Sequence, residues 1–104
     1  MDTYIIVTTL CDKKEIANAI QIELLEKKLV SGCQLTTCES TYWWQGKIET
    51  ATEYHLEMRS KKSLYPEIEK TIRFLHDYET AEISYCEIKG STEFLNWIQS
   101  ETTN

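Results

Sequence analysis

Residues 33–59 restrict the folds open to this chain more than any other stretch. Two arms rich in β-branched and aromatic residues, 33–44 and 47–59, flank the dipeptide Gln45-Gly46. Glycine adopts positive φ at little cost, so a two-residue loop that ends in glycine between two such arms predicts a tight turn. The sequence therefore predicts one long β-hairpin.

The length of the turn decides which residues face each other across this hairpin. A two-residue turn places Leu35 opposite Leu56 and Cys33 opposite Met58. Alternate side chains of a strand point to the same face, so these apolar pairs lie together. We expect that face to cover a hydrophobic core, with Cys33 packed there as a small apolar side chain.

The arms are long for a chain of this size. The twelve residues of the first arm, at roughly 3.3 Å each, reach about 40 Å, whereas a compact chain of about 100 residues is about 33 Å across. The tip would overhang its own domain and leave large apolar side chains in water, which favours aggregation unless another subunit covers them. We therefore expect a subunit interface at Tyr42, Trp43, Trp44 and Ile48.

The rest of the chain predicts two more strands and three helices. Strands are expected at 4–9 and 81–88, and helices after Asp12, over 64–75, and after Gly90-Ser91. Asp12 with Glu15 resembles a capping box at the first helix. The order βαββαβα predicts a ferredoxin-like βαββαβ sandwich of the α+β class, with a C-terminal helix and the hairpin protruding.

Right-handed crossovers would put both long helices of this fold on one face of the sheet and leave the other face bare. A chain of 104 residues is long enough to bury its own core. We therefore expect a single domain over residues 1–104, with the bare face of its sheet covered by a partner.

Composition limits the classes of partner. A net charge of −6 and a pI near 4.9 disfavour nucleic acid and anionic membranes, because both need a basic face. We find no apolar run of membrane-spanning length and no signal-peptide pattern. We expect a cytoplasmic protein with free thiols at Cys11, Cys33, Cys38 and Cys86.

Three motifs stand out along the chain: Ser40-x-Tyr42-x-Trp44-x-Gly46-Lys47, His76-x-Tyr78-Glu79 and Leu95-x-Trp97-Ile98. With these motifs, the chain resembles the CutA family of divalent-cation-tolerance proteins over nearly its whole length. The resemblance implies a tight homotrimer like the PII signalling trimers, in which each hairpin extends the sheet onto a neighbour. It also implies a link to tolerance of and response to divalent metal ions, copper among them, with no established reaction.

The resemblance further implies clefts between subunits that take a small ligand, a metal or a partner protein. The candidate cleft residues in this sequence are Trp44, Glu53, Arg59, His76, Tyr78 and Glu79. For His76, at a helix end, three roles remain open: metal ligand, general base, or a local cap on the negative end of the helix dipole.

Metal binding has two candidate sites. The positions of the three copper ligands proposed in the family hold Thr8, Leu75 and His76 in this sequence, so only His76 is retained as a metal ligand. The other candidate is on the hairpin, where Cys38, Glu53 and His55 share a face and could hold a soft divalent ion, or could form a polar subunit contact. We expect no required cofactor and at most weak binding of copper or zinc.

The sequence offers little for catalysis. It has no nucleophile elbow, no glycine-rich phosphate loop and only three glycines. We expect a non-enzymatic binding or scaffold protein without catalytic residues. The alternative is a small hydrolase or isomerase that uses His76 and Glu79 across a subunit interface.

Overall fold

Four strands form one antiparallel sheet in the order β2-β3-β1-β4. The computed structural model describes residues 2–103. The elements are β1 (Tyr4–Cys11), α1 (Lys14–Glu26), β2 (Gly32–Trp44), β3 (Lys47–Lys61), the 3₁₀ turn η1 (Lys62–Leu64), α2 (Tyr65–Leu75), β4 (Ile83–Ile88) and α3 (Thr92–Glu101). This is the predicted ferredoxin-like α+β order with a C-terminal helix.

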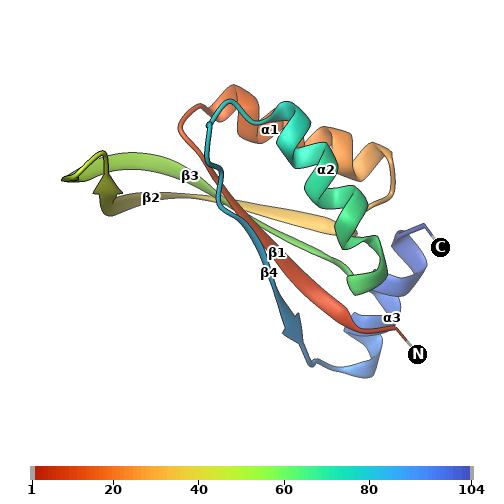
Figure 1. Ribbon diagram of the computed structural model, residues 1–104. Coiled ribbons are helices and arrows are strands. Elements are labelled where there is room, and N and C mark those ends of the chain that lie inside the picture. The colour runs from red at the N-terminus through yellow and green to blue at the C-terminus, as the bar shows by residue number, and fades with distance from the viewer. Residues whose placement is uncertain (1, 104) are drawn as a thin grey trace.

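The helices divide between two places. Figure 1 shows α1 and α2 lying over one face of the sheet, and α3 with both chain ends lying far from the hairpin tip. The arrangement follows from right-handed crossovers in both βαβ-like halves. Within residues 2–103, none of the helices is long and apolar enough to cross a membrane.

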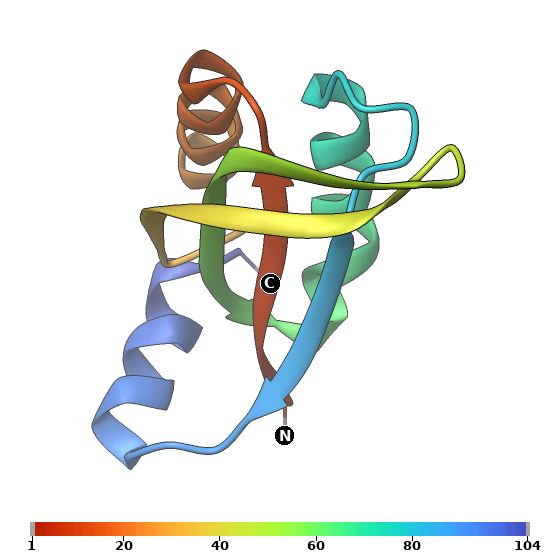
Figure 2. The same cartoon turned by 90° about the vertical axis from the view of Figure 1, so that its left-hand side faces the viewer.

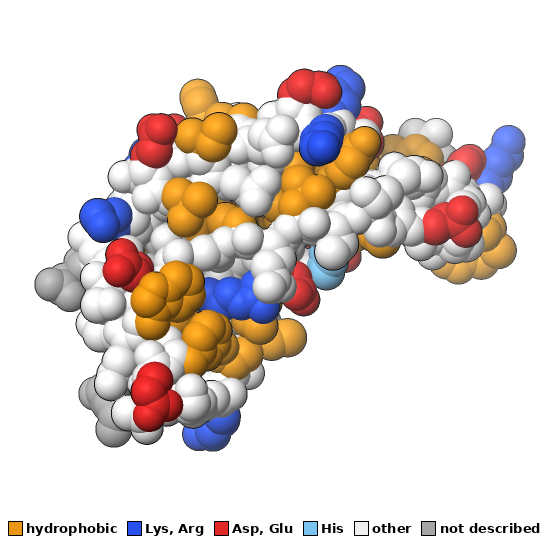
Figure 3. All heavy atoms as spheres, turned by 180° about the vertical axis from the view of Figure 1, so that it is seen from behind, with side chains coloured by type: hydrophobic (Ala, Val, Ile, Leu, Met, Phe, Trp, Pro, Cys, Tyr) orange, Lys and Arg blue, Asp and Glu red, His pale blue; other side chains and the backbone are white. Residues whose placement is uncertain are grey.

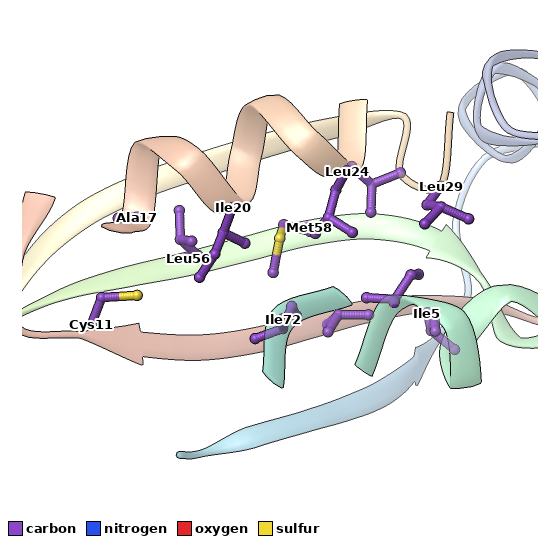
Figure 4. Packing of buried hydrophobic residues seen from close by; sticks show 12 residues of the cluster. Ile5, Cys11, Ala17, Ile20, Leu24, Leu29, Leu56, Met58 and Ile72 are labelled. Atoms are coloured by element: carbon purple, nitrogen blue, oxygen red, sulfur yellow. The ribbon is translucent and has the colours of Figure 1, made fainter. Parts of the chain in front are cut away.

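The core lies between the sheet and the two long helices. Residues of β1 alternate between buried and half-buried positions, with Ile5 and Val7 facing the helices. Leu56 and Met58 of β3 are fully buried beneath α1, as Figure 4 shows. Both were predicted to lie on the core face, and Cys33 packs against this cluster as expected.

The hairpin has the predicted register throughout. Its pairs run from Trp44 opposite Lys47 to Gly32 opposite Arg59 without a slip. Gln45 and Gly46 close the turn with φ angles of 50° and 78°. Two successive positive φ values fit the right-handed twist of the flanking strands, which explains the glycine.

The hairpin also overhangs as predicted. β1 pairs with β3 over Tyr54–Lys61, so the outer part of β3 has only β2 beside it. The structure measures 44 × 24 × 21 Å, and Figure 3 shows the hairpin projecting from the body. At the tip, Trp43 is 73% exposed and Ile48 is 64% exposed.

Three predicted boundaries were wrong, and the first is the end of β1, which was expected at residue 9 and lies at Cys11. α1 begins at Lys14, with Lys13 in an extended conformation at its N-cap and no side-chain cap, so Asp12 does not form the predicted capping box. The reason is that β1 continues to Cys11, and the chain must turn before the helix can start. β4 begins at Ile83, two residues later than predicted, because its pairing with β1 starts there, with Ile83 opposite Thr9.

We expect Leu56→Ala to lower the free energy of unfolding by about 2–5 kcal/mol, because it removes a fully buried side chain from the middle of the core. Urea titration at fixed protein concentration measures the change. Phe74→Ala, on the outer face of α2 where the side chain is 88% exposed, serves as the control and should change the free energy of unfolding little. Equal stability of Leu56→Ala and wild type would contradict this placement of the core.

Candidate functional site

A cleft of about 860 Å³ lies between the overhanging hairpin and the segment that follows α2. Figure 2 shows the hairpin tip and this segment at the same end of the molecule. The cleft is lined by five carboxylate side chains and four aromatic side chains, but by neither lysine nor arginine: Asp12, Glu53, Asp77, Glu79 and Glu82, with Tyr42, Trp43, Trp44 and Tyr78. Its chemistry is therefore acidic and aromatic.

Glu53 and Tyr78 form the best-defined interaction in the cleft. The Tyr78 hydroxyl donates to the Glu53 carboxylate at 2.6 Å, and Glu53 is only 4% exposed. Burial, followed by this hydrogen bond and the nearby negative charge, raises the pKa of Tyr78. The phenol is therefore a stable donor, and the buried carboxylate has the partner that burial demands.

His76 lies behind the cleft and not on its surface. Its side chain is 1% exposed. Nδ1 accepts a hydrogen bond from the backbone N–H of Tyr78 at 3.1 Å, so Nε2 carries the proton and donates to the Leu10 carbonyl at 2.6 Å. Both ring nitrogens are thus occupied in the neutral ring, which leaves no lone pair for a metal or for proton abstraction.

The cap on the helix dipole, one of the three roles left open for His76, is not made by its ring. His76 is the C-cap residue of α2, but its ring bonds to β1 and to its own loop and not to the last carbonyls of the helix. The backbone N–H of His76 makes the capping contact with Ile72 instead. The imidazole therefore ties the segment after α2 to the sheet.

Cys11 is a neighbour of His76 that the sequence analysis did not single out. Its Sγ lies 3.8 Å from His76 Nε2. Burial, with a smaller contribution from Asp77, raises the pKa of Cys11 to about 11. The thiol is protonated and the nearby nitrogen is a donor, so the pair lacks the base that a cysteine nucleophile needs. The one feature of the sequence that could have pointed to Cys11 is the alternation of β1, which places its side chain on the inward face.

The predicted hairpin metal site is not assembled within one chain. Among residues 2–103, no group of three or more His, Cys, Asp or Glu side chains is placed to hold a metal ion. Cys38 does lie opposite Glu53, and His55 lies opposite Thr36. The carboxylate of Glu53, however, is bound by Tyr78, which removes the central ligand of that set.

The six predicted cleft residues separate into three places. Trp44, Glu53, Tyr78 and Glu79 line the cleft, and His76 lies behind it. Arg59 lines a different hollow, of about 250 Å³, beside Trp97 of α3. Arg59 lies six positions along β3 from Glu53, roughly 20 Å at 3.3 Å per residue, so a single chain does not bring Arg59 to the cleft.

Known proteins resemble this chain in sequence. A family model described as CutA1 divalent ion tolerance protein matches residues 5–101. The divalent-cation tolerance protein CutA of Archaeoglobus fulgidus is 36% identical over 85 residues, which cover 81% of this chain and 83% of that protein. CutA of Thermococcus kodakarensis is 34% identical over 99 residues, 94% of each chain.

Solved structures agree with these matches. CutA1 of Pyrococcus horikoshii superposes with a TM-score of 0.91 at 28% identity, over 96% of this chain and 99% of that one. The Archaeoglobus fulgidus protein, described as the periplasmic divalent cation tolerance protein CutA, gives a TM-score of 0.87 at 33% identity over 97% and 98%. Sequence and structure agree over nearly the whole length, and the chain therefore belongs to the CutA1 divalent ion tolerance protein family.

Proposed function

We propose that this chain is a non-enzymatic homotrimer, of the PII-like type, that acts in tolerance of and response to divalent cations, with copper among them. Its clefts are completed by neighbouring subunits and take a small ligand, a metal ion or a partner. The observation that carries the proposal is the hairpin tip, which holds exposed large apolar side chains beyond the body of its own subunit.

Exposure at the tip favours self-association. Tyr42, Trp43, Trp44 and Ile48 are all more than one-third exposed, and large apolar side chains left exposed together at one tip mark an interaction site. The sheet also has two free edges, β2 and β4. If the tip of one subunit contacts a free sheet edge of the next, the two contacting surfaces are different. Such a contact fits a head-to-tail ring better than a two-fold dimer, in which both subunits contribute the same surface.

The hydrogen bonds made by the titratable groups in and behind the cleft agree with a binding role. Glu53, Tyr78 and His76 bond to one another and to the backbone. The alternative, a hydrolase or isomerase with an interfacial His76 and Glu79, would need a free imidazole nitrogen, and both are bonded in this chain. The aromatic and acidic walls of the cleft can bind but hold no activated nucleophile.

The metal part of the proposal is weak, surface-type binding without a resident cofactor. His76 is buried and both of its ring nitrogens are bonded. Thr8 and Leu75, at the other two matched positions, are not soft-metal donors. The carboxylates that remain in the cleft are those of Asp12, Glu79 and Glu82, since Asp77 pairs with Lys13 at 3.3 Å.

We also propose that the protein works in the cytoplasm, because Cys11, Cys33, Cys38 and Cys86 are free thiols, which a reducing compartment maintains. We expect it in the cytosolic fraction after cell fractionation. Recovery with periplasmic markers, the place by which its Archaeoglobus fulgidus relative is described, would contradict this.

The double variant Trp43→Asp, Trp44→Asp should dissociate or aggregate the trimer, because two charges replace the apolar tip. Sedimentation velocity at micromolar concentration measures the change. Phe74→Asp is the matched control, since it puts a charge in place of an exposed aromatic residue of α2, and it should leave the trimer intact. A wild-type chain that sediments as a monomer would refute the trimer.

Protein purified without added metal should contain far less than one copper or zinc ion per chain, and chelator should leave its melting temperature unchanged, because affinity needs several fixed ligands. Elemental analysis and thermal melts provide the two measurements. One tightly held ion per chain would contradict this prediction. Its loss in Cys38→Ser would then locate it on the hairpin, and its loss in His76→Ala behind the cleft.

A further inference from the structure

One side-chain hydrogen bond ties the overhanging part of the hairpin to a different segment of its subunit. β1 pairs with β3 as far as Tyr54, so Glu53 is the first residue of β3 beyond β1. Residues 38–53 pair only with one another across the ladder. Within the part of the chain that the structure describes, Tyr78–Glu53 is the one side-chain hydrogen bond or ion pair that links residues 38–53 to another segment.

Tyr78 is itself held in place from two sides. Its backbone N–H donates to His76 Nδ1 at 3.1 Å, and its ring lies 4.8 Å from the imidazole ring. His76 Nε2 in turn donates to the carbonyl of Leu10 in β1. A continuous series of contacts therefore runs from β1 through two rigid rings to Glu53, at the root of the overhang.

The backbone pairing of β2 with β3 does not by itself fix the direction in which the overhang leaves the body of the subunit. Two-stranded ribbons twist more than wide sheets, and an isolated pair of strands is marginally stable in water. The Tyr78–Glu53 bond is short, is made to a buried carboxylate, and loses little to water. Without the phenol, the carboxylate would be buried without a donor unless the hairpin moved.

We infer that Tyr78 is a positioning residue for assembly: it holds Glu53, and through it the hairpin, in the direction that presents the tip to a second copy of this chain. The role rests on the trimer proposed above. This positioning role belongs to the segment after α2, which carries Tyr78, because that segment and not the sheet sets the angle of the hairpin to the body of the subunit.

The decisive variant is Tyr78→Phe, which removes only the hydroxyl. Tyr65→Phe is the matched control, because the Tyr65 hydroxyl donates to the Ile83 carbonyl at 3.3 Å and lies outside the overhang. We expect Tyr78→Phe to raise amide hydrogen exchange roughly tenfold or more over residues 39–53 and to weaken self-association by a similar factor. Amides of residues 54–61 should keep their wild-type exchange.

Variants of Glu53 test the same bond from its other end. Glu53→Gln keeps an oxygen acceptor and should preserve most of the protection, whereas Glu53→Leu should behave like Tyr78→Phe. If the bond carries the effect, the double variant Tyr78→Phe, Glu53→Leu should be no worse than either single variant.

Two results would overturn the inference. One is unchanged exchange and unchanged assembly in Tyr78→Phe. The other is an equal rise over 39–53 and 54–61, which would show general destabilisation and not positioning. A wild-type monomer would refute the trimer itself, and the exchange comparison would still decide whether Tyr78 holds the hairpin.

Discussion

The length of β3 is the constraint on which the rest of the structure depends. β3 has 15 residues and its inner neighbour β1 has 8. The inner half of β3 lies between β1 and β2 and carries Leu56 and Met58 into the core. The outer half pairs with β2 alone. One continuous strand therefore both closes the core and carries an arm beyond it.

The arm has a cost and a use. It leaves Trp43 and its neighbours in water, which a lone subunit tolerates poorly. The same overhang creates the acidic and aromatic cleft between the hairpin and the segment after α2. Association through the tip would remove the cost and enclose the cleft, so assembly and ligand binding share one structural origin in our proposal.

The residues behind the cleft are arranged for rigidity. His76 uses both ring nitrogens, Tyr78 keeps its proton, and Cys11 is a buried thiol with a raised pKa. The residue types alone would also suit a catalytic site. In this chain the hydrogen bonds leave His76 without a free acceptor nitrogen, and a donor nitrogen cannot accept the proton of a nucleophile.

The sequence by itself determined the hairpin, its register, the exposed tip and the ferredoxin-like order, because alternation, turn length and helical period are local properties that act over a few residues. Only the tertiary structure decided the site. The Glu53–Tyr78 bond joins residues 25 positions apart and the His76–Leu10 bond residues 66 positions apart, and no spacing rule encodes them. Arg59 was grouped with cleft residues by resemblance, yet in one chain it lies six positions further along β3 than Glu53, beside Trp97 of α3, because each residue of an extended strand advances the chain by about 3.3 Å.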